Sequence, residues 1–544
     1  MIHIGTETWK RAAAALALPL LLAACTTGPD YRRPELNIPG SYKSAQADDA
    51  ARSGPGREWW LLFNDPELTA LAEEALGANL DLKAAMARVE QSRSSSRYVK
   101  GSFYPVVTLD PSATRSHAPA TKAEQSNSVE QQVSEAASAV NQITGLIGQL
   151  SSLAQGNSSA TGSGSQGGSG NSGTGTGGAA ISATTSNRFQ VPFDLSYEID
   201  LWGRIRRSYE SAKAQERASV YDLEVVRQTL LADLARNYFN LRSFDAQYEI
   251  LNRNLTLYEE QVNLTENQYK AGLTDETDLL QAQVTLGTTR AQAVDTQRQR
   301  TDLEHAIAML LGRAPTDFSL PVRPLAGTPP VVPAGLPSDL LRQRPDVAES
   351  EQNLAAACAE IGVAQADFYP AVRLTGSAGF QSSDLKDLLN WGSVAASFGP
   401  GISLPIFKGG QLKASLAKAR ARHAELDAVY RSRVLGAFVD VEDSLTDLRL
   451  RAEAADAQAR AVKAAREYLR LVHIQYQTGV TDYLHVVIAE KTLLNNELSE
   501  AQILNQRMVS SVLLIKAIGG GWDAGADAPA NGAAPPAGDT AMSG

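Results

Sequence analysis

The sequence predicts a mainly helical fold with a membrane β-barrel, in which two tandem repeats each supply a long coiled-coil helical hairpin and two β-strands. Three observations predict this fold. A stretch of 67 residues, from Ile205 to Ala271, contains neither glycine nor proline. Several motifs recur downstream at a constant offset, which indicates an internal repeat. Short segments alternate apolar and polar residues at period two, which is typical of strands.

The stretch from Ile205 to Ala271 is expected to form one helix about 100 Å long. From Leu223 to Val262 its apolar and aromatic residues recur about every 3.5 residues, the period of a left-handed supercoil. The following segment, Leu273 to Leu311, contains a single glycine, Gly287. The two segments therefore predict a helical hairpin over residues 204–312, too long for an ordinary globular core.

A second copy of the hairpin is expected over residues 410–519, because six residues recur at an offset of 207: Gly203 as Gly410, Tyr269 as Tyr476, Gly272 as Gly479, Thr274 as Thr481, Asp275 as Asp482 and Gly312 as Gly519. Further upstream, Phe103-Tyr104-Pro105 recurs as Phe368-Tyr369-Pro370 at an offset of 265. The first copy therefore carries an insert. The predicted organisation is a first repeat over 25–312, a proline-rich connector over 313–345, a second repeat over 346–522 and a disordered tail over 523–544.

Strands are expected near 103–112 and 188–201 in the first repeat, and near 370–382 and 392–406 in the second. Every odd position from Phe189 to Leu201 is apolar or aromatic, which is the strongest of these signals. Four strands cannot close a barrel, and open edges cannot exist in lipid, so several chains must share one barrel. A dimer would supply eight strands and a trimer twelve. Because eight-stranded barrels are largely filled by side chains, a conducting pore favours the trimer.

The insert, about 118–186, has a composition of its own. Gly156 to Ser186 consists almost wholly of Gly, Ser, Thr, Ala and Asn, which cannot bury enough apolar surface to fold. Apolar residues between Val129 and Leu150 occur at helical spacings, which is compatible with a short amphipathic helix. Since the insert lies between two predicted strands, it is expected to be a hairpin loop at the end of the barrel opposite the long helices.

The N-terminus reads as a processing signal. Lys10 and Arg11 precede an apolar run that ends in Leu22-Ala23-Ala24-Cys25, which looks like a lipobox; an ordinary signal peptide is the alternative. Residues 1–24 are then a lipoprotein signal peptide, and Cys25 becomes the acylated first residue of the mature chain. Incorporation of labelled palmitate would test this acylation. The next residue is Thr26 rather than aspartate, which predicts the outer membrane.

Composition excludes several classes of protein. The formal net charge of −10 without a basic cluster disfavours nucleic-acid binding. Beyond the N-terminus no run of 18 apolar residues exists that could form a membrane-spanning helix. No His/Cys cluster has metal-ligand spacing, and no cofactor is predicted. Carboxylates such as Asp339 and Asp346 are expected to start helices, and Cys358 to be a core residue, so the protein is not expected to be an enzyme.

Several motifs together resemble a known family. They are Gly28-Pro29-Asp30-Tyr31 with Pro34 after Cys25, the segment from Trp59-Trp60 to Leu68, the segment from Gly335-Leu336-Pro337-Ser338-Asp339 to Arg344-Pro345-Asp346, and the two Phe-Tyr-Pro motifs. This pattern resembles the TolC/NodT-type outer-membrane efflux lipoproteins of tripartite RND pumps, over about residues 25–522 apart from the insert. The resemblance implies a homotrimer with a twelve-stranded barrel, an α-helical periplasmic tunnel and an equatorial collar built from the connectors.

The resemblance also implies roles for the two hairpin ends. The first hairpin end (Gly272, Leu273 and Thr274) and the second hairpin end (Gly479, Val480 and Thr481) correspond to the places where the family docks its adaptor, although a glycine is also what a sharp reversal needs. In the family, a leucine five residues after the second glycine and an aspartate nine residues after it line a periplasmic gate. Here these positions are Leu484 and Ile488, so an apolar closure is expected. His485 would either face the axis or, as the preferred alternative, face outward.

The resemblance implies a passive outer-membrane duct that exports small molecules, including antibiotics, as part of an RND-type efflux system. The expected partners are a periplasmic adaptor protein, an inner-membrane RND transporter and outer-membrane lipid, with the helices in the periplasm. Two alternatives remain open: the outer-membrane component of type I protein secretion, and a structural or adaptor lipoprotein that conducts nothing. The alternating strands argue against the last, because an adaptor needs no lipid-facing sheet.

Overall fold

The structure is a computed structural model that describes residues 26–36, 38–43, 56–118, 184–332 and 340–522. The chain divides into a helical unit and a smaller strand unit, and the strand unit comprises the described parts of 105–198 and 373–401. The predicted signal peptide, Cys25, most of the insert and the tail lie outside the described residues, so those predictions stay predictions.

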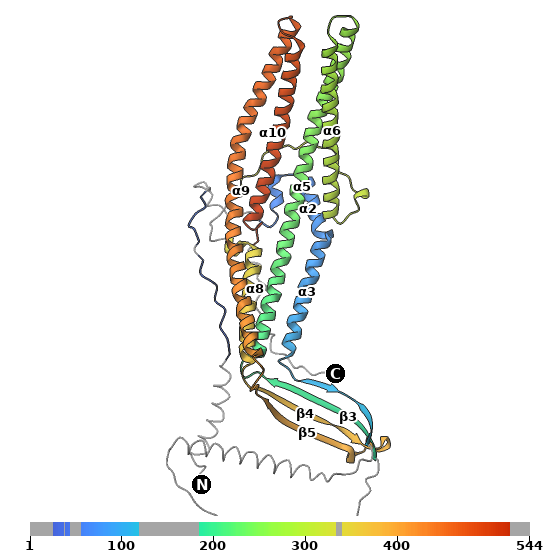
Figure 1. The fold of residues 1–544 in the computed structure, drawn as a ribbon, viewed down its shortest axis with the longest axis vertical. Helices are drawn as coiled ribbons and strands as arrows, with labels where there is room; N and C mark the ends of the chain where they lie inside the picture. Colours follow the sequence, from blue (N-terminus) through green and yellow to red (C-terminus); the bar gives the residue numbers. More distant parts are fainter. Residues whose placement is uncertain (1–25, 37, 44–55, 119–183, 333–339, 523–544) are drawn as a thin grey trace, which may run out of the picture. The chain divides into compact units, whose positions relative to one another are not determined.

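The long helices of the helical unit repeat with matching bounds (Figure 1). Helices α5 (Arg204–Lys270) and α9 (Gln411–Gln477) both have 67 residues, and α6 (Glu276–Leu310) and α10 (Tyr483–Ala517) both have 35. Helices α5 and α9 each begin after a glycine in the left-handed region, Gly203 with φ of 81° and Gly410 with φ of 85°. The predicted hairpins are thereby confirmed, and so is the offset between them.

The shorter helices precede the long ones, and two of them begin at side-chain caps. They are the 3₁₀ turn η2 (Trp59–Phe63), α2 (Pro66–Ala78) and α3 (Leu80–Gly101) in the first repeat, and η3 (Pro315–Asp317), α7 (Leu340–Gln343) and α8 (Pro345–Ala366) further on. Asp65 caps α2 by accepting hydrogen bonds from the amides of Glu67 and Leu68, with Pro66 at the first helical position. Asn79 caps α3 by accepting from the amide of Leu82.

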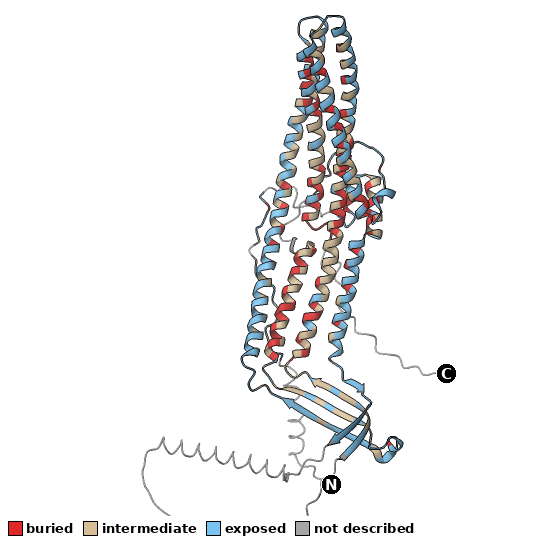
Figure 2. Cartoon of the chain, turned by 45° about the vertical axis from the view of Figure 1, so that its right-hand side comes forward, coloured by how far each residue is buried: buried red, intermediate tan, exposed pale blue. Residues whose placement is uncertain are grey.

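Helix α5 is the centre of the helical unit. It packs against α3 and α8 over its first half, and against α6 and α10 further along, whereas α9 packs against α8 and α10. The main hydrophobic core lies where η2 and α2 meet α5 and the end of α10, with Trp60, Leu234 and Val512 among its buried residues. Helix α8 is also buried along much of its length (Figure 2).

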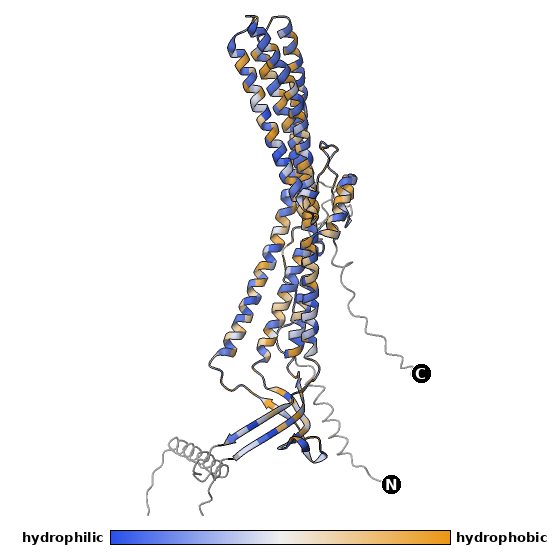
Figure 3. Cartoon of the chain, turned by 90° about the vertical axis from the view of Figure 1, so that its right-hand side faces the viewer, coloured by the Kyte–Doolittle hydropathy of each residue, from blue (hydrophilic) through white to orange (hydrophobic). Residues whose placement is uncertain are grey.

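Hydrophobic and hydrophilic residues are interspersed along the long helices (Figure 3). Within the described residues, no helix combines the length and the apolar character that crossing a bilayer would require.

The strand unit contains one antiparallel hairpin whose first strand is interrupted. Strands β1 (Val106–Leu109) and β2 (Ser112–Ala118) both pair with β3 (Thr184–Ile199), in the same register. The interruption at Asp110-Pro111 arises because proline has no amide hydrogen for the ladder. Strands β4 (Ala371–Ser382) and β5 (Val394–Ser403) extend the sheet in the order β1-β3-β4-β5, with the 3₁₀ turns η5 (Leu385–Asp387) and η6 (Trp391–Ser393) between them.

The predicted strand bounds were partly wrong. The first strand runs to Ala118 rather than residue 112, and β3 begins at Thr184 rather than residue 188, so the insert starts and ends inside a longer hairpin. The added residues are mostly polar and include no large apolar side chain, so they give no alternation, yet they pair through their backbones. Strand β5 ends at Ser403 rather than at residue 406, while its alternating apolar pattern continues into the following loop.

One face of the sheet carries exposed apolar side chains. Phe398 and Ile402 of β5 are 72% and 73% exposed, and Val107 and Phe193 are also exposed. A Cβ atom on Gly376 would meet the Phe398 ring at 3.1 Å and Leu195 at 3.7 Å, so these positions share that face. An ion pair joins Arg373 of β4 to Glu198 of β3, with 3.5 Å between the charged atoms.

Candidate functional site

The two hairpin ends have the same backbone structure. In the first, the amide of Gly272 donates to the carbonyl of Tyr269 and the amide of Leu273 donates to that of Gln268, both at 2.9 Å. The second repeats this pattern from Gly479 and Val480. Both glycines have φ of 73°, so each helix ends in a Schellman motif that only glycine forms without strain. The glycines are therefore explained by backbone geometry alone.

The side chains at the hairpin ends are arranged differently. Leu273 and Val480 are 78% and 75% exposed, and both threonines are partly buried. The Thr274 hydroxyl donates to the carboxylate of Asp278, at 2.5 Å. In the second end, Asp482 instead caps α10 by accepting from the amide of His485. The structure thus brings the predicted docking residues together at each end, with an exposed aliphatic side chain at both.

The predicted gate residues share one face of α10. Leu484 and Ile488 are 52% and 47% exposed, while the intervening Val486 and Val487 are buried. His485 lies on the same exposed face, which we call the exposed α10 face (Leu484, His485 and Ile488). Large aliphatic side chains that remain exposed on an ordered helix often mark a contact surface.

His485 has a partner that the sequence analysis did not assign. Its Nδ1 lies 2.5 Å from Oδ1 of Asp482, three residues earlier. The hydrogen bond from His485 lowers the pKa of the Asp482 carboxyl. The spacing of the two residues at a helix start could have suggested this contact, because an aspartate at the N-cap accepts from the third residue of the helix.

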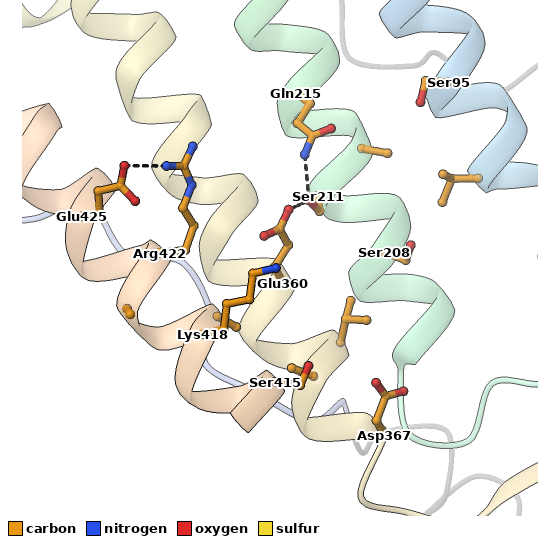
Figure 4. A pocket seen from close by; sticks show the side chains of 16 residues that line it. Ser95, Ser208, Ser211, Gln215, Glu360, Asp367, Ser415, Lys418, Arg422 and Glu425 are labelled. Atoms are coloured by element: carbon orange, nitrogen blue, oxygen red, sulfur yellow. Dashed lines mark hydrogen bonds and ion pairs between the residues drawn. The ribbon is translucent and has the colours of Figure 1, made fainter. Parts of the chain in front are cut away.

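A groove of about 800 Å³, lined by small, polar and charged residues, lies on the helical unit between α3, α5, α8 and α9 (Figure 4). Its lining has serine hydroxyls from three of these helices and no apolar side chain larger than valine. Arg422 donates to Glu425 at 2.6 Å, and the Ser211 hydroxyl donates to Glu360 at 3.5 Å. The groove was missed from the sequence because its residues come from four segments far apart in the chain.

The segment after Cys25 is held firmly by the helical unit. The amide and the hydroxyl of Thr27 both donate to the carbonyl of Trp202, at 3.0 and 2.9 Å. Gly28 has φ of 94°, and a Cβ atom there would lie 2.4 Å from Cα of Gly362, so only glycine fits. Trp202 stacks on Tyr369, with 4.8 Å between ring centroids. Cys25 itself lies outside the described residues.

Two observations bear on catalytic and metal chemistry in the part of the chain that the structure describes. No group of three or more His, Cys, Asp or Glu side chains there could hold a metal ion. Cys358 is buried, and burial raises the pKa of its thiol, which is unfavourable for a nucleophile.

Comparison with known proteins decides the family. The model of the family described as "Outer membrane efflux protein" matches residues 132–313 and 336–520. The chain belongs to this family. The toluene efflux pump outer membrane protein TtgI of Pseudomonas putida is 32% identical over 515 residues, which cover 92% of this chain and 97% of the relative. The cation efflux system protein CusC of Escherichia coli is 27% identical over 508 residues, 92% of this chain and 97% of CusC.

Solved structures agree with this assignment. The outer-membrane channel OprN superposes with a TM-score of 0.77 and 30% identity, covering 92% of this chain and all of OprN. The open state of the MtrE outer membrane channel of Neisseria gonorrhoeae superposes with a TM-score of 0.71 and 27% identity, covering 91% of this chain and 98% of MtrE.

The efflux family supplies the biological setting. The protein is an outer-membrane channel of a tripartite efflux system and has its helices in the periplasm. It forms a trimer and works with an adaptor protein and an inner-membrane RND transporter. The predicted trimeric fold and duct function are confirmed, and the family is one of transporters rather than enzymes.

Proposed function

We propose that this efflux protein is a passive duct for small molecules, closed at rest by the exposed α10 face. The observation that carries the proposal is the exposure of Leu484 and Ile488 beside the buried Val486, Val487 and Ala489. In a trimer with α10 near the axis, three copies of these aliphatic side chains meet and exclude water from the lumen. Opening requires only that the second hairpin end move outward.

The groove on α3, α5, α8 and α9 is a candidate for the wall of the duct beyond this closure. We infer that it lines the duct, because its lining has no apolar side chain larger than valine that could retain a passing solute. Relatives are named for toluene, solvent, antibiotic and cation efflux, and a weakly selective wall suits such different cargoes. Selection then rests with the transporter.

Planar-bilayer conductance tests the proposed closure. Leu484→Ser replaces an aliphatic side chain with a hydroxyl that admits water, so its conductance should exceed that of the wild type several-fold. Thr277→Ser, at the equivalent position of the first repeat, is the matched control and should leave conductance unchanged. Equal conductance of Leu484→Ser and wild type would remove Leu484 from the gate, and the absence of any discrete conductance would contradict the duct.

We further propose that acylated Cys25 anchors each chain in the outer membrane. The support is the fixation of Thr27 on Trp202, which ties the start of the mature chain to the residues that follow β3. Cys25→Ser should abolish labelling by radioactive palmitate. A mature Cys25→Ser protein that still incorporates the label would contradict lipidation at this residue.

A further inference from the structure

A buried carboxylate lies directly behind the proposed closure. Glu490 of α10 follows Val486 by one turn and precedes Leu494 by another, so it occupies a core position of the seam that α10 forms with α5 and α9. Its side chain is only 12% exposed. One of its oxygens, Oε2, is fully buried and accepts no hydrogen bond within the described part of the chain.

The charged groups that α9 places near Glu490 do little to stabilise its ionised carboxylate. His473 Nε2 lies 3.6 Å from Glu490 Oε1, which is beyond a good hydrogen bond, and the imidazole is partly exposed. Tyr476 packs on Tyr483, the first residue of α10, with 6.0 Å between ring centroids. Arg466 points to a different acid, Glu497, and lies 3.0 Å from it.

From α5, no cation is free to pair with Glu490 either. Arg253 is engaged by Glu497 at 2.5 Å, two turns further along α10. Tyr258 is buried, and its hydroxyl has no hydrogen-bond partner among the described residues. Glu260 lines the same cavity of about 570 Å³ as Glu490 and His473, and adds a like charge. Glu497 is thus bonded by two arginines, whereas Glu490 has neither.

The first repeat shows that this carboxylate is not part of the shared hairpin framework. Its equivalent, 207 residues earlier, is Gln283, which is neutral and exposed on α6. A buried acid without an arginine or lysine partner normally costs stability, and strongly perturbed acids cluster at functional sites.

We propose that Glu490 is a proton-sensitive packing residue that controls how tightly the first turns of α10 lie against α5 and α9. Protonated, its neutral carboxyl fits the apolar seam; ionised, it draws water into the seam and loosens the segment that carries Leu484 and Ile488. The effect on packing stands on the burial of Glu490, whereas its effect on conductance rests on the closure proposed above.

The direction of the pH dependence follows from the carboxyl. Burial raises the pKa of Glu490 to about 7, while the pKa of a hydrated glutamate stays in its usual range near 4.5. The packed state therefore holds its proton where the loosened state has lost it. Packing is fully favoured below about pH 4.5, is weakened progressively as the pH rises, and loses the contribution above about pH 7.

Amide hydrogen exchange of the detergent-solubilised trimer tests the packing step. After correction for the intrinsic pH dependence of exchange, protection of residues 483–494 should fall several-fold between pH 5.5 and pH 8. Glu490→Gln, which keeps the shape of the side chain, should be protected equally at both pH values. Glu467→Gln removes an equal charge from an exposed site on α9 at a similar level and should behave like the wild type.

Three outcomes would overturn the proposal: no pH dependence in the wild type, an unchanged dependence in Glu490→Gln, or its loss in His473→Gln, which would assign the titration to the histidine. Bilayer conductance of the same variants separates the two proposals. If exchange follows Glu490 while wild-type conductance does not change with pH, the packing role is supported and its coupling to the closure is overturned, whereas the closure itself stands or falls with the conductance of Leu484→Ser. If both follow Glu490, both are supported.

Discussion

The two long hairpins have equal helix lengths and different surroundings. Helix α5 buries 21 residues and α9 only 8, although both have 67 residues and similar ends. The difference arises because α5 passes between α3 and α8, whereas α9 lies at the edge of the single chain. Its exposed Leu435 and Val439 are the kind of surface that we expect a neighbouring chain of the trimer to cover. A repeat therefore sets helix lengths, but position in the assembly sets burial.

The two hairpins place their charges differently even at a position where both have an ion pair between their two helices. In the first repeat Arg290 of α6 pairs with Glu259 of α5, and both are exposed. At the equivalent positions of the second repeat, Glu497 of α10 pairs with Arg466 of α9, so the two charges have exchanged places. The second pair differs again because Arg253 of α5 joins it, which links the two hairpins and buries Glu497.

Of the substitutions compared between the two repeats, those at Arg242 and its equivalent are expected to differ most in their effect on the free energy of unfolding. Buried Arg242 of α5 donates to Asp245 and to Glu67 of α2, at 2.7 and 2.6 Å, and Arg300 of α6 donates to the other oxygen of Asp245. Arg242→Met removes one partner of this buried network and should lower the free energy of unfolding by about 3 kcal/mol. Its repeat equivalent, Arg449, pairs with Glu453 near the surface, so Arg449→Met should cost less than about 0.5 kcal/mol.

Thermal unfolding of the detergent-solubilised trimer measures both Arg variants. Equal midpoints for Arg242→Met and Arg449→Met would show that the network at Asp245 contributes no more than a surface pair.

A smaller difference is expected for the exchanged ion pair. Glu497→Gln leaves Arg253 and Arg466 facing each other and should destabilise the trimer by about 1 kcal/mol, a modest figure because both arginines are more than half exposed and water screens them. Arg290→Gln, the equivalent change in the first repeat, breaks an exposed pair and should cost a few tenths of a kcal/mol at most. If Arg290→Gln lost more stability than Glu497→Gln, the pair in the first repeat would be the stronger one, against this prediction. Raising the salt concentration should reduce the difference in stability loss between the two variants.

The smallest effect on stability, and the most direct test of docking, is expected at the hairpin ends. Thr274→Cys and Thr481→Cys each change a partly buried threonine beside an exposed Leu273 or Val480, so both should fold, and Thr274→Cys loses only the hydrogen bond from its hydroxyl to Asp278. Crosslinking from either cysteine should capture the periplasmic adaptor, with Ala246→Cys in the middle of α5 as the control. Capture no stronger than from position 246 would argue against docking at these ends. A strong difference between positions 274 and 481 would show that one hairpin docks alone.

The sequence by itself determined the helices, the repeat and the family resemblance. Helix bounds follow from local signals, since glycines stand directly before α5 and α9 and just after their last turns. The offset of 207 carried those bounds from one hairpin to the other. The family motifs led to Leu484 and Ile488, and the structure places both on one exposed face.

Only the tertiary structure decided what each side chain contacts. The network at Asp245 joins residues from three helices and the connector, the long pairing of β2 with β3 involves polar residues without alternation, and the burial of Glu490 depends on α5 as well as α9. None of these features has a local sequence signal. The physical reason is that burial and pairing are set by which segments meet in space, whereas propensity and periodicity report only on near neighbours along the chain.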